Sequence, residues 1–423
     1  MKQYARSIVV WVLGIQVRRL RKKNDLTIVG VVGSIGKTST KLAIAQTLGA
    51  TRTVRYQTGN YNDIVSVPLV FFGLDLPSLL NPFAWLKVFI KTERVIGSDY
   101  PYEIVVVELG TDGPGQIAAF KRYLMLDIAV VTSIAPEHME YFKDIDEVAK
   151  EELSVIQYAK SVVINSDLIA HEYRSLIPEA VTYAIDDPAD FKIEAPVFSN
   201  EGTSFSVAKE GVELFEATHH SFAKAQLYSL LASATVGNLL GFDGQSLNEG
   251  YRKVEQVSGR LQRLKGVLGS TIIDDSYNAS PEATTAALEM IYAIDAPQKI
   301  ALLGNMNELG AFSQAAHQEV GALCDPNELD EVVTLGPDAN MHLATAAEAQ
   351  GCKVTRTNSP YEAGKYIRGI IKQNAVVLVK GSQNNVFAEE AIKSLLEDEA
   401  DVAKLVRQSK SWLAIKSRNF KSS

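Results

Sequence analysis

The sequence is poor in the residues that build disulfide scaffolds and zinc sites. Its 423 residues include two cysteines, Cys324 and Cys352, and six histidines. Neither cysteine belongs to a CxxC or Cys/His spacing, so we expect reduced, structural thiols in a cytoplasmic protein. The net charge of −8 leaves no domain-wide basic face, which argues against a nucleic-acid partner.

Long apolar runs are also scarce. Residues 8–17 are apolar, but this run is about half of the roughly 20 residues that span a bilayer as a helix. Its basic residues follow at 18–23, which is the reverse of a signal peptide. Three interpretations stay open for this helix: packing on the next domain, peripheral contact with a membrane surface, or an oligomer contact.

The remaining composition is that of a globular protein with several domains. Hydrophobic residues make up 46% and charged residues 22%, and the length allows two or three domains. We expect an N-terminal apolar and basic helix at 1–25, a central domain at 26–257 and a C-terminal domain at 258–423.

Residues 26–41, LTIVGVVGSIGKTSTK, organise the central domain. An apolar run typical of a buried parallel strand breaks at two glycines, and a helical pattern follows. A strand, a glycine loop, Lys-Thr and a helix predict a phosphate-binding loop, although Val31 stands where the usual first glycine would be. The expected phosphate contacts are Gly33, Ser34, Ile35, Gly36, Lys37, Thr38 and Ser39.

Polar residues follow the next predicted strands, and the carboxyl ends of parallel strands face the ligand crevice. The strand at 102–110 ends at Glu108, a natural Mg²⁺ ligand beside a phosphate loop, and His138 follows the strand at 127–135. The amide-rich stretch 57–69 holds Asn60 and Asn62. It is either a substrate contact or a solvated loop.

The pattern then changes twice. Residues 190–218 alternate in short stretches that predict an antiparallel flap. After Gly259, a second alternation of strands and helices predicts a small doubly wound sheet, so the fold class is α/β. The expected strands are 270–274, 299–304, 331–335 and 375–380. The expected helices are 281–294, 313–323, 339–350, 361–372 and 386–397, with an amphipathic helix after residue 400.

Eight motifs occur in a fixed order along the chain. They are GSIGKTSTK (33–41), TGNYNDIVSVPL (58–69), VVELG (106–110), SIAPEHMEYF (133–142), GRLQ (259–262), IIDDSYNASPEA (272–283), LLGNMNELG (302–310) with His317 later, and KGSQN (380–384). In this order the chain resembles the Mur ligase family, most of all the branch that adds D-alanyl-D-alanine in peptidoglycan synthesis. The resemblance implies a central P-loop ATPase domain with a parallel sheet and a C-terminal Rossmann-like domain.

The resemblance also implies an ATP-dependent amide ligase that works through an acyl phosphate, with Mg²⁺. The partners would be a muropeptide-like carboxylate donor and a D-Ala-D-Ala-like amine acceptor. The implied catalytic residues are Lys37, Glu108, His138, Glu152 and Arg260. The implied metal ligands are Thr38, Glu108, His138 and Glu152. The nucleotide would be approached by Arg260, Asp275, Tyr277 and Asn278. The amine side would be lined by Asn305, Glu308, Lys380, Ser382 and Gln383.

The sequence departs from the family pattern at four places. Glu152 stands two positions after Lys150, where a carbamylated lysine is expected, and supplies a carboxylate with shorter reach. Val32 replaces a threonine, and Ala225 and Ser229 replace the usual His and Asn.

The fourth departure is that only about 25 residues precede the phosphate loop, so the family's N-terminal UDP-sugar-binding domain is not expected. The donor is then held differently, a partner supplies that domain, or another carboxylate is used. The alternatives are a ligase for cyanophycin-, folylpolyglutamate- or lipid-II-type substrates, and a non-catalytic nucleotide-binding protein.

Overall fold

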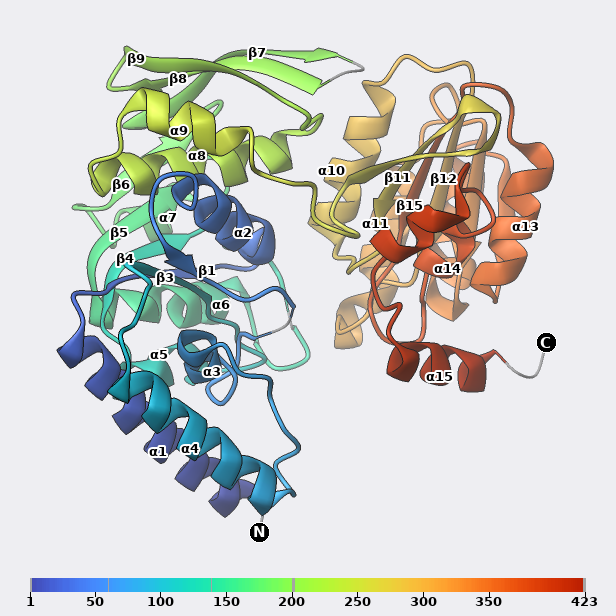
Figure 1. Cartoon of the computed structure of the whole chain (residues 1–423). Helices are drawn as coiled ribbons and strands as arrows, with labels where there is room; N and C mark the ends of the chain where they lie inside the picture. Colours follow the sequence, from blue (N-terminus) through green and yellow to red (C-terminus); the bar gives the residue numbers. More distant parts are fainter. Residues whose placement is uncertain (1, 60, 138, 200–201, 421–423) are drawn as a thin grey trace. The chain divides into compact units, whose positions relative to one another are not determined.

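The computed structural model describes residues 2–59, 61–137, 139–199 and 202–420 (Figure 1). The predicted site residues Asn60 and His138 lie outside this part of the chain. Two compact units are present: Met1–Pro136 with Tyr141–Glu255, and Glu137–Glu140 with Gln256–Ser423.

The first unit is built on one sheet with the strand order β2-β3-β1-β4-β5-β6-β7-β8-β9. Strands β2 to β7 pair in parallel, whereas β7, β8 and β9 pair antiparallel. The predicted parallel sheet and antiparallel flap are therefore confirmed. The strands are Thr27–Val32 (β1), Val54–Arg55 (β2), Ile104–Glu108 (β3), Leu126–Val131 (β4), Ala159–Asn165 (β5), Val181–Ala184 (β6), Phe191–Ser199 (β7), Gly202–Lys209 (β8) and Val212–His219 (β9).

Two helical layers cover this sheet, because apolar side chains of a buried strand alternate between its faces. In β1, Val29 and Val31 join the core under α2, α8 and α9, whereas Ile28 and Val32 join the core under α1, α3, α4 and α6. The helices are Lys2–Lys23 (α1), Lys37–Leu48 (α2), Val67–Phe72 (α3), Pro82–Gly97 (α4), Gln116–Ala119 (α5), Ile145–Leu153 (α6), His171–Arg174 (α7), Lys224–Leu239 (α8) and Gly244–Tyr251 (α9).

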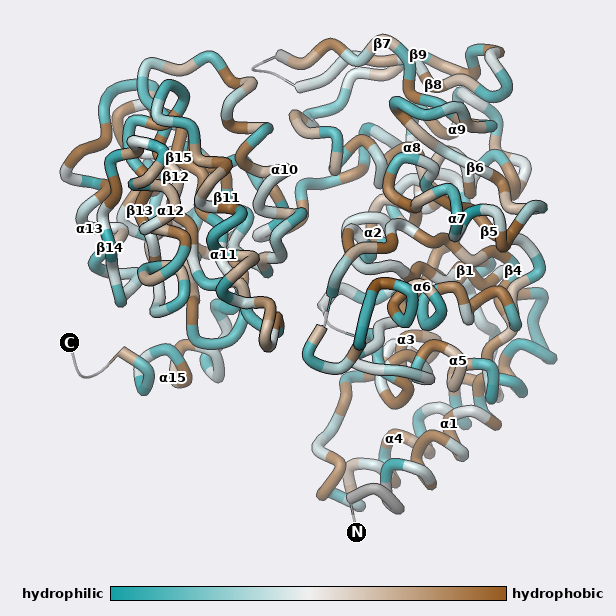
Figure 2. The backbone as a smooth tube through the Cα atoms, turned by 180° about the vertical axis from the view of Figure 1, so that it is seen from behind, coloured by the Kyte–Doolittle hydropathy of each residue, from teal (hydrophilic) through white to brown (hydrophobic). Residues whose placement is uncertain are grey.

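The N-terminal helix α1 packs on this unit, as one of the three interpretations predicted. Leu13, Val17 and Leu20 are fully buried in the core that α4 also lines. The backbone tube shows α1 and α4 side by side, with hydrophobic segments along both (Figure 2). No helix in the described part of the chain is long and apolar enough to cross a membrane.

The second unit has the strand order β10-β11-β15-β12-β13-β14, parallel except for the β10–β11 pair. This confirms the predicted doubly wound sheet. The strands are Gln262–Lys265 (β10), Thr271–Asp275 (β11), Lys299–Gly304 (β12), Glu331–Leu335 (β13), Val354–Thr357 (β14) and Val376–Lys380 (β15). The helices are Pro281–Tyr292 (α10), Ser313–Ala322 (α11), Ala344–Ala349 (α12), Pro360–Ile370 (α13), Glu389–Ile392 (α14) and Lys410–Asn419 (α15).

Some predicted elements are wrong in extent. The predicted helix 386–397 is α-helical only at Glu389–Ile392. Asn384, Asn385 and Phe387 have positive φ angles of 63°, 66° and 51°, so a regular helix begins only after them. In the first unit, α6 ends at Leu153 and continues as a 3₁₀ helix at Ser154–Tyr158. The short strands β2, β6, β10 and β14 were not predicted.

Candidate functional site

The predicted phosphate loop joins the end of β1 to the start of α2. Gly33 has φ +122°, and a Cβ there would lie 2.4 Å from Thr132 Oγ1, so only glycine fits. Gly36, with φ +87°, precedes α2, and no described side chain caps that helix. The first N–H groups of α2 therefore have no capping side chain, which suits them to phosphate oxygens. Residues 35–39 are only half-buried, within reach of a ligand.

The loop is fixed by the neighbouring strand β4 and the residues after it. Thr132 Oγ1 donates to the Ile35 carbonyl at 2.6 Å, and Ser133 Oγ accepts from the Ile35 N–H at 2.7 Å. Ser34 Oγ accepts from the Ala135 N–H at 3.0 Å. Sequence reasoning missed Thr132 and Ser133, although a Thr-Ser pair at the carboxyl end of a strand was the available signal.

Glu152 contacts the loop directly. Its side chain is buried, and Oε2 accepts a hydrogen bond from the Gly33 N–H at 2.8 Å. The adjacent Glu151 points elsewhere and accepts from the N–H groups of Gly115 and Ile117 at 2.6 and 2.7 Å. The two neighbouring glutamates therefore contact different segments. The geometry gives Glu152 a positioning contact, while its role as a metal ligand stays a prediction.

Glu108 lies at the carboxyl end of β3 and forms a buried ion pair. Its Oε2 is 3.1 Å from Lys41 Nζ, and both side chains are almost fully buried. Burial alone would raise the pKa of Glu108, but the positive charges of Lys41 and Lys37, with hydrogen bonds from Lys41 and Thr38, hold that pKa below its usual value. Asn62 Nδ2 also donates to Glu108 Oε1, at 3.4 Å.

Lys41 is a site residue that sequence reasoning did not single out. It follows Lys37 by four positions, one helical turn, so both ammonium groups lie on the same face of α2. Lys37 Nζ itself donates to the carbonyl oxygens of Gly33 and Ser34. Two lysines thus act on one carboxylate beside the loop.

The residues present fit a magnesium ion shared with phosphates. Mg²⁺ prefers hard oxygen ligands and usually keeps waters and phosphate oxygens in its shell. Thr38 and the ionised Glu108 supply such oxygens next to the loop. Among the residues described, no group of three or more His, Cys, Asp or Glu side chains could hold a metal ion. The predicted ligand set of Thr38, Glu108, His138 and Glu152 stays a prediction.

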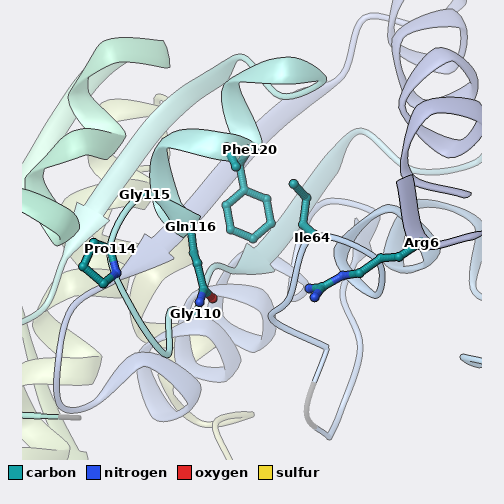
Figure 3. Close-up of a pocket in the computed structure, with 8 residues that line it drawn as sticks. Arg6, Ile64, Gly110, Pro114, Gly115, Gln116 and Phe120 are labelled. Carbon is teal, nitrogen blue, oxygen red and sulfur yellow. The ribbon is translucent and has the colours of Figure 1, made fainter. Parts of the chain in front are cut away.

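A small cavity of about 140 Å³ adjoins the end of β3 (Figure 3). Arg6 of α1 and Ile64 point into it, and Gly110, Gln116 and Phe120 line it. Pockets that enclose a drug-sized ligand have roughly 300–1,000 Å³. The cavity therefore does not enclose a nucleotide, and the phosphate loop lies outside its lining.

In the second unit, two predicted ligand contacts pair with each other. Lys380 Nζ lies 2.5 Å from Asp275 Oδ2, because the two residues are register partners in β15 and β11. Lys380 also donates to the Asn278 carbonyl at 3.1 Å, and Asp275 accepts from the Leu261 N–H at 3.2 Å.

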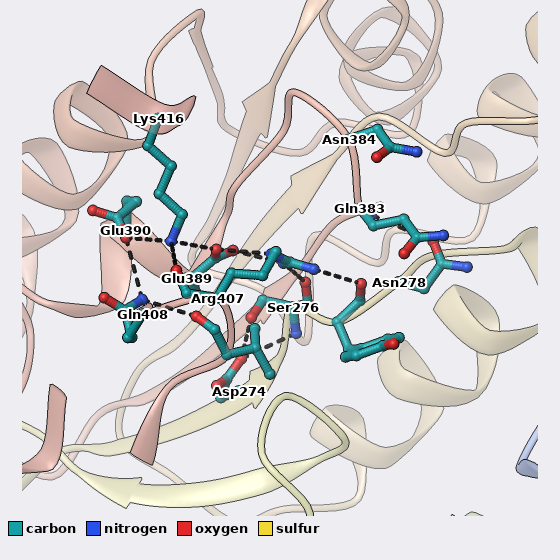
Figure 4. Close-up of polar contacts among 12 residues, drawn as sticks. Asp274, Ser276, Asn278, Gln383, Asn384, Glu389, Glu390, Arg407, Gln408 and Lys416 are labelled. Atoms are coloured by element: carbon teal, nitrogen blue, oxygen red, sulfur yellow. Dashed lines mark hydrogen bonds and ion pairs between the residues drawn. The ribbon is translucent and has the colours of Figure 1, made fainter. Parts of the chain in front are cut away.

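Tyr277 lies between two arginines. The Arg260 guanidinium lies 4.2 Å from the ring centroid and that of Arg407 5.9 Å. Arg407 also donates to the carbonyls of Ser276 and Tyr277 at 2.6 and 3.0 Å, and pairs with buried Glu389 at 2.7 Å (Figure 4). The structure thus brings Arg260 and Tyr277 together, while their contact with the nucleotide stays a prediction. Arg407 was not predicted.

A lysine of α15 completes this buried network. Lys416 Nζ lies 2.7 Å from carboxylate oxygens of both Glu389 and Glu390. The C-terminal helix is therefore tied by ion pairs to α14, and Arg407 links Glu389 of α14 to the segment that holds Tyr277 (Figure 4). Three buried charges in 386–416 explain why that region could not be read from hydrophobic periodicity alone.

The residues predicted on the amine side gather at the carboxyl ends of β12 and β15. Ser382 Oγ accepts from the Asn307 N–H at 2.9 Å, and Asn278 Oδ1 accepts from the Gln383 N–H at 3.4 Å. Asn305 Oδ1 accepts from the Ala339 N–H at 2.9 Å, an internal contact. Glu308 has a positive φ of 66°.

His317, noted from the sequence, is fully buried in the same unit. Its Nε2 accepts from the Met306 N–H at 3.0 Å, and its Nδ1 lies 2.7 Å from the Ser313 carbonyl. Burial lowers the pKa of His317, so the ring is held neutral beside the β12 loop.

A glycine loop before an uncapped helix, an ionised buried carboxylate beside two lysines, and a second doubly wound unit define a P-loop nucleotide-binding enzyme. Residues 90–237 match the Mur ligase middle domain, and residues 259–383 match the Mur ligase glutamate ligase domain. The chain belongs to the Mur ligase family and is an ATP-dependent amide ligase whose cofactors are ATP and Mg²⁺.

Individual relatives extend the match over most of the chain. It is 27% identical to the UDP-N-acetylmuramoyl-tripeptide--D-alanyl-D-alanine ligase of Bacillus subtilis over 88% of this chain and 76% of that enzyme. Identity to the Escherichia coli ligase of the same name is 26%, over 90% and 79%.

Solved structures agree in fold. MurF from Acinetobacter baumannii superposes with a TM-score of 0.75 at 19% identity, over 91% of this chain and 80% of that chain. MurF from Thermotoga maritima in complex with ADP has a TM-score of 0.74 at 24% identity, over 93% and 84%.

Proposed function

We propose that this enzyme adds D-alanyl-D-alanine to a UDP-N-acetylmuramoyl-tripeptide in peptidoglycan synthesis. The observation that carries the proposal is the buried Lys41–Glu108 pair beside Lys37 and Thr38, set in a chain that matches ligases of that name over most of its length.

The proposed reaction has two steps. The donor carboxylate attacks the γ-phosphorus of ATP, the bond to the β-phosphate oxygen breaks, and an acyl phosphate and ADP form. The amine nitrogen then attacks the acyl carbon and loses a proton, while inorganic phosphate leaves. Both steps gather negative charge at the transferred phosphoryl group, which fixed positive charges stabilise.

The residues of the first unit divide this work. Backbone N–H groups of the loop and Lys37 hold the β- and γ-phosphates, and Thr38 and Glu108 are the ligands for Mg²⁺, which neutralises phosphate charge when bound. Lys41 keeps Glu108 ionised and oriented. Arg260 and Tyr277 are proposed nucleotide contacts, and Ser382 and Gln383 are proposed amine contacts.

The test is phosphate release from Mg-ATP with a panel of donors and amines, followed by mass spectrometry of the products. Release that requires both UDP-MurNAc-tripeptide and D-Ala-D-Ala, with the matching amide, supports the proposal. Turnover only with another donor and amine, such as a glutamate-type pair, supports the ligase mechanism but contradicts the proposed substrates. Turnover that appears only after a cell fraction is added indicates a partner that supplies donor binding.

We also propose that the enzyme works in peripheral contact with a membrane through its N-terminal helix. The outer face of α1 carries Ile8 and Trp11 in exposed positions, 60% and 66% accessible. Such side chains are not needed for packing on the sheet.

A further inference from the structure

Helices α1 and α4 share one exposed apolar surface. Besides Ile8 and Trp11 on α1, the first turns of α4 expose Phe83 (78%) and Leu86 (56%), and Leu80 just before α4 is 67% exposed. Large apolar side chains that are exposed together mark interaction sites more often than isolated ones do. We call these five residues, Ile8, Trp11, Leu80, Phe83 and Leu86, the apolar tip.

The two helices run side by side in the same direction, which brings the members of the tip to one end. Gln16 Nε2 donates to Glu93 Oε1 at 3.0 Å, and Lys23 Nζ, farther along α1, donates to the Ile96 carbonyl at 3.0 Å. Residues of α1 therefore lie beside residues about 74 positions later. By this offset Trp11 lies beside the turn that holds Leu86, and Ile8 beside the turn that holds Phe83. Figure 1 shows α1 and α4 side by side.

The residues of the apolar tip are not the ones that pack α1 and α4 against the hydrophobic core. The inner sides of both helices are filled by other residues, among them Leu13 and Val17 of α1 and Trp85 and Val88 of α4, all buried. The helix pair is therefore already packed on the first unit, and the tip is an additional apolar surface on its outside.

Basic side chains follow the tip along both helices. Helix α1 has no acidic residue, and five of its seven basic residues follow Trp11. Arg18 and Lys22 are among the exposed ones. On α4, Lys87 and Lys91 are exposed in the turns after Phe83 and Leu86. The one acidic residue of α4, Glu93, pairs with Arg19 at 2.7 Å. We call the exposed Arg18, Lys22, Lys87 and Lys91 the basic collar. This concentration of positive charge contrasts with the net charge of −8 of the whole chain.

We propose that the apolar tip and basic collar of α1 and α4 form a docking surface for an anionic lipid bilayer. Trp and Phe side chains insert at the level of the headgroups, and each nearby Lys or Arg adds about 1 kcal/mol of attraction to an anionic surface. A second copy of the chain is a poor occupant, since two such surfaces would place two basic collars together.

This inference deepens the proposed membrane contact and does not depend on the ligase substrates. It adds α4 to the docking surface that was first proposed for α1 alone, and it specifies an anionic lipid as the partner. Binding to vesicles is measured without nucleotide, donor or amine, so failure here leaves the proposed ligase reaction standing, and failure of that reaction leaves this surface standing.

The experiment measures co-sedimentation of the full chain with vesicles of phosphatidylcholine alone or with 30% phosphatidylglycerol, chosen as probes. We expect binding only to the anionic vesicles, with a large loss when salt is raised from 50 to 500 mM, because screening weakens the collar. Equal binding to neutral and anionic vesicles, or none to either, overturns the proposal.

Variants locate the surface. Trp11→Ser with Phe83→Ser should weaken binding to anionic vesicles at least tenfold, and Lys87→Gln with Lys91→Gln should weaken it severalfold at low salt. The matched control is Val212→Ser with Met341→Ser, two apolar side chains that are 68% and 66% exposed elsewhere. An equal loss in the control, or a dimer in solution that the Trp11/Phe83 variant dissociates, assigns the surface to something other than lipid. Unchanged thermal unfolding of each variant excludes misfolding as the cause.

Discussion

Both units place a buried lysine–carboxylate pair at the carboxyl ends of parallel strands, yet the two pairs differ in what surrounds them. Lys41 and Glu108 lie 3.1 Å apart beside a half-buried glycine loop and a second lysine, Lys37. Lys380 and Asp275 lie 2.5 Å apart, and their remaining hydrogen bonds are to backbone groups of the same unit.

The difference teaches that polar strand ends are not equivalent evidence for a site. The first pair borders N–H groups and a hydroxyl that a ligand can reach, so its charge can act on that ligand. The second pair joins β11 to β15 and fixes the segment that holds Tyr277. We therefore expect this pair to contribute mainly to the stability of the second unit. If substitutions in the two pairs change the free energy of unfolding and the catalytic rate to the same extent, this distinction between the pairs is wrong.

The largest expected effect is on the stability of the second unit. Lys380→Met leaves Asp275 as a buried charge without its partner and should lower the free energy of unfolding by about 3–5 kcal/mol. Urea unfolding followed by circular dichroism measures it. Adding Asp275→Leu should recover part of the loss, since both charges are then gone. A variant as stable as the wild type would show that the pair is not a structural link.

The next effect is on catalysis, with little change in stability. Lys37→Met removes a positive charge from the loop and should lower kcat for phosphate release by about 10²–10³-fold, as for other fixed groups that stabilise transition-state charge. Thermal unfolding should move little, because Lys37 is only half-buried. A fall in kcat below tenfold would remove Lys37 from the phosphate site.

Sequence patterns predicted the two α/β sheets and the central residues of the phosphate site. They did not predict contacts between residues that are distant in the sequence. The glycine loop and Glu108 were predicted because strand and helix periodicity places them at one sheet edge. Lys41, Thr132 and Arg407 were missed, since each acts on a residue brought near only by packing. The helix expected at 386–397 is α-helical only at Glu389–Ile392, where buried Glu389 pairs with Arg407 and Lys416, contacts that the sequence pattern does not show.

The third prediction separates the units by pH. Burial lowers the pKa of His219 in the first unit to about 4. The unfolded state then binds the proton more readily than the folded state. The contribution of neutral His219 to the free energy of unfolding is therefore complete above pH 6.5 and is lost as pH falls toward 4. Burial raises the pKa of Asp274 in the second unit to about 6. The folded state then binds the proton more readily, so stability rises as pH falls from 6 toward 4.

Each group accounts for about 3 kcal/mol across its window. Calorimetric unfolding of the full chain at pH 4, 5, 6 and 7 should show the two contributions with opposite sign when the wild type is compared with His219→Gln and with Asp274→Asn. Asp274→Asn should stabilise the chain at pH 7 and lose this advantage near pH 4. The same pH dependence in both variants would contradict the prediction.

The smallest effect is expected at Glu152, where the comparison can be sharpened to a single charge. Glu152→Gln keeps an oxygen that accepts the Gly33 N–H and removes the negative charge, so the charge-assisted part of that hydrogen bond is lost. The cost should be about 1 kcal/mol, which is less than a tenfold fall in kcat. A titration of phosphate release with Mg²⁺ provides the readout, and Glu151→Gln, which touches a different segment, is the matched control. If kcat instead falls a hundredfold and the Mg²⁺ requirement rises, Glu152 acts on the metal, in the place where the family resemblance implies a carbamylated lysine.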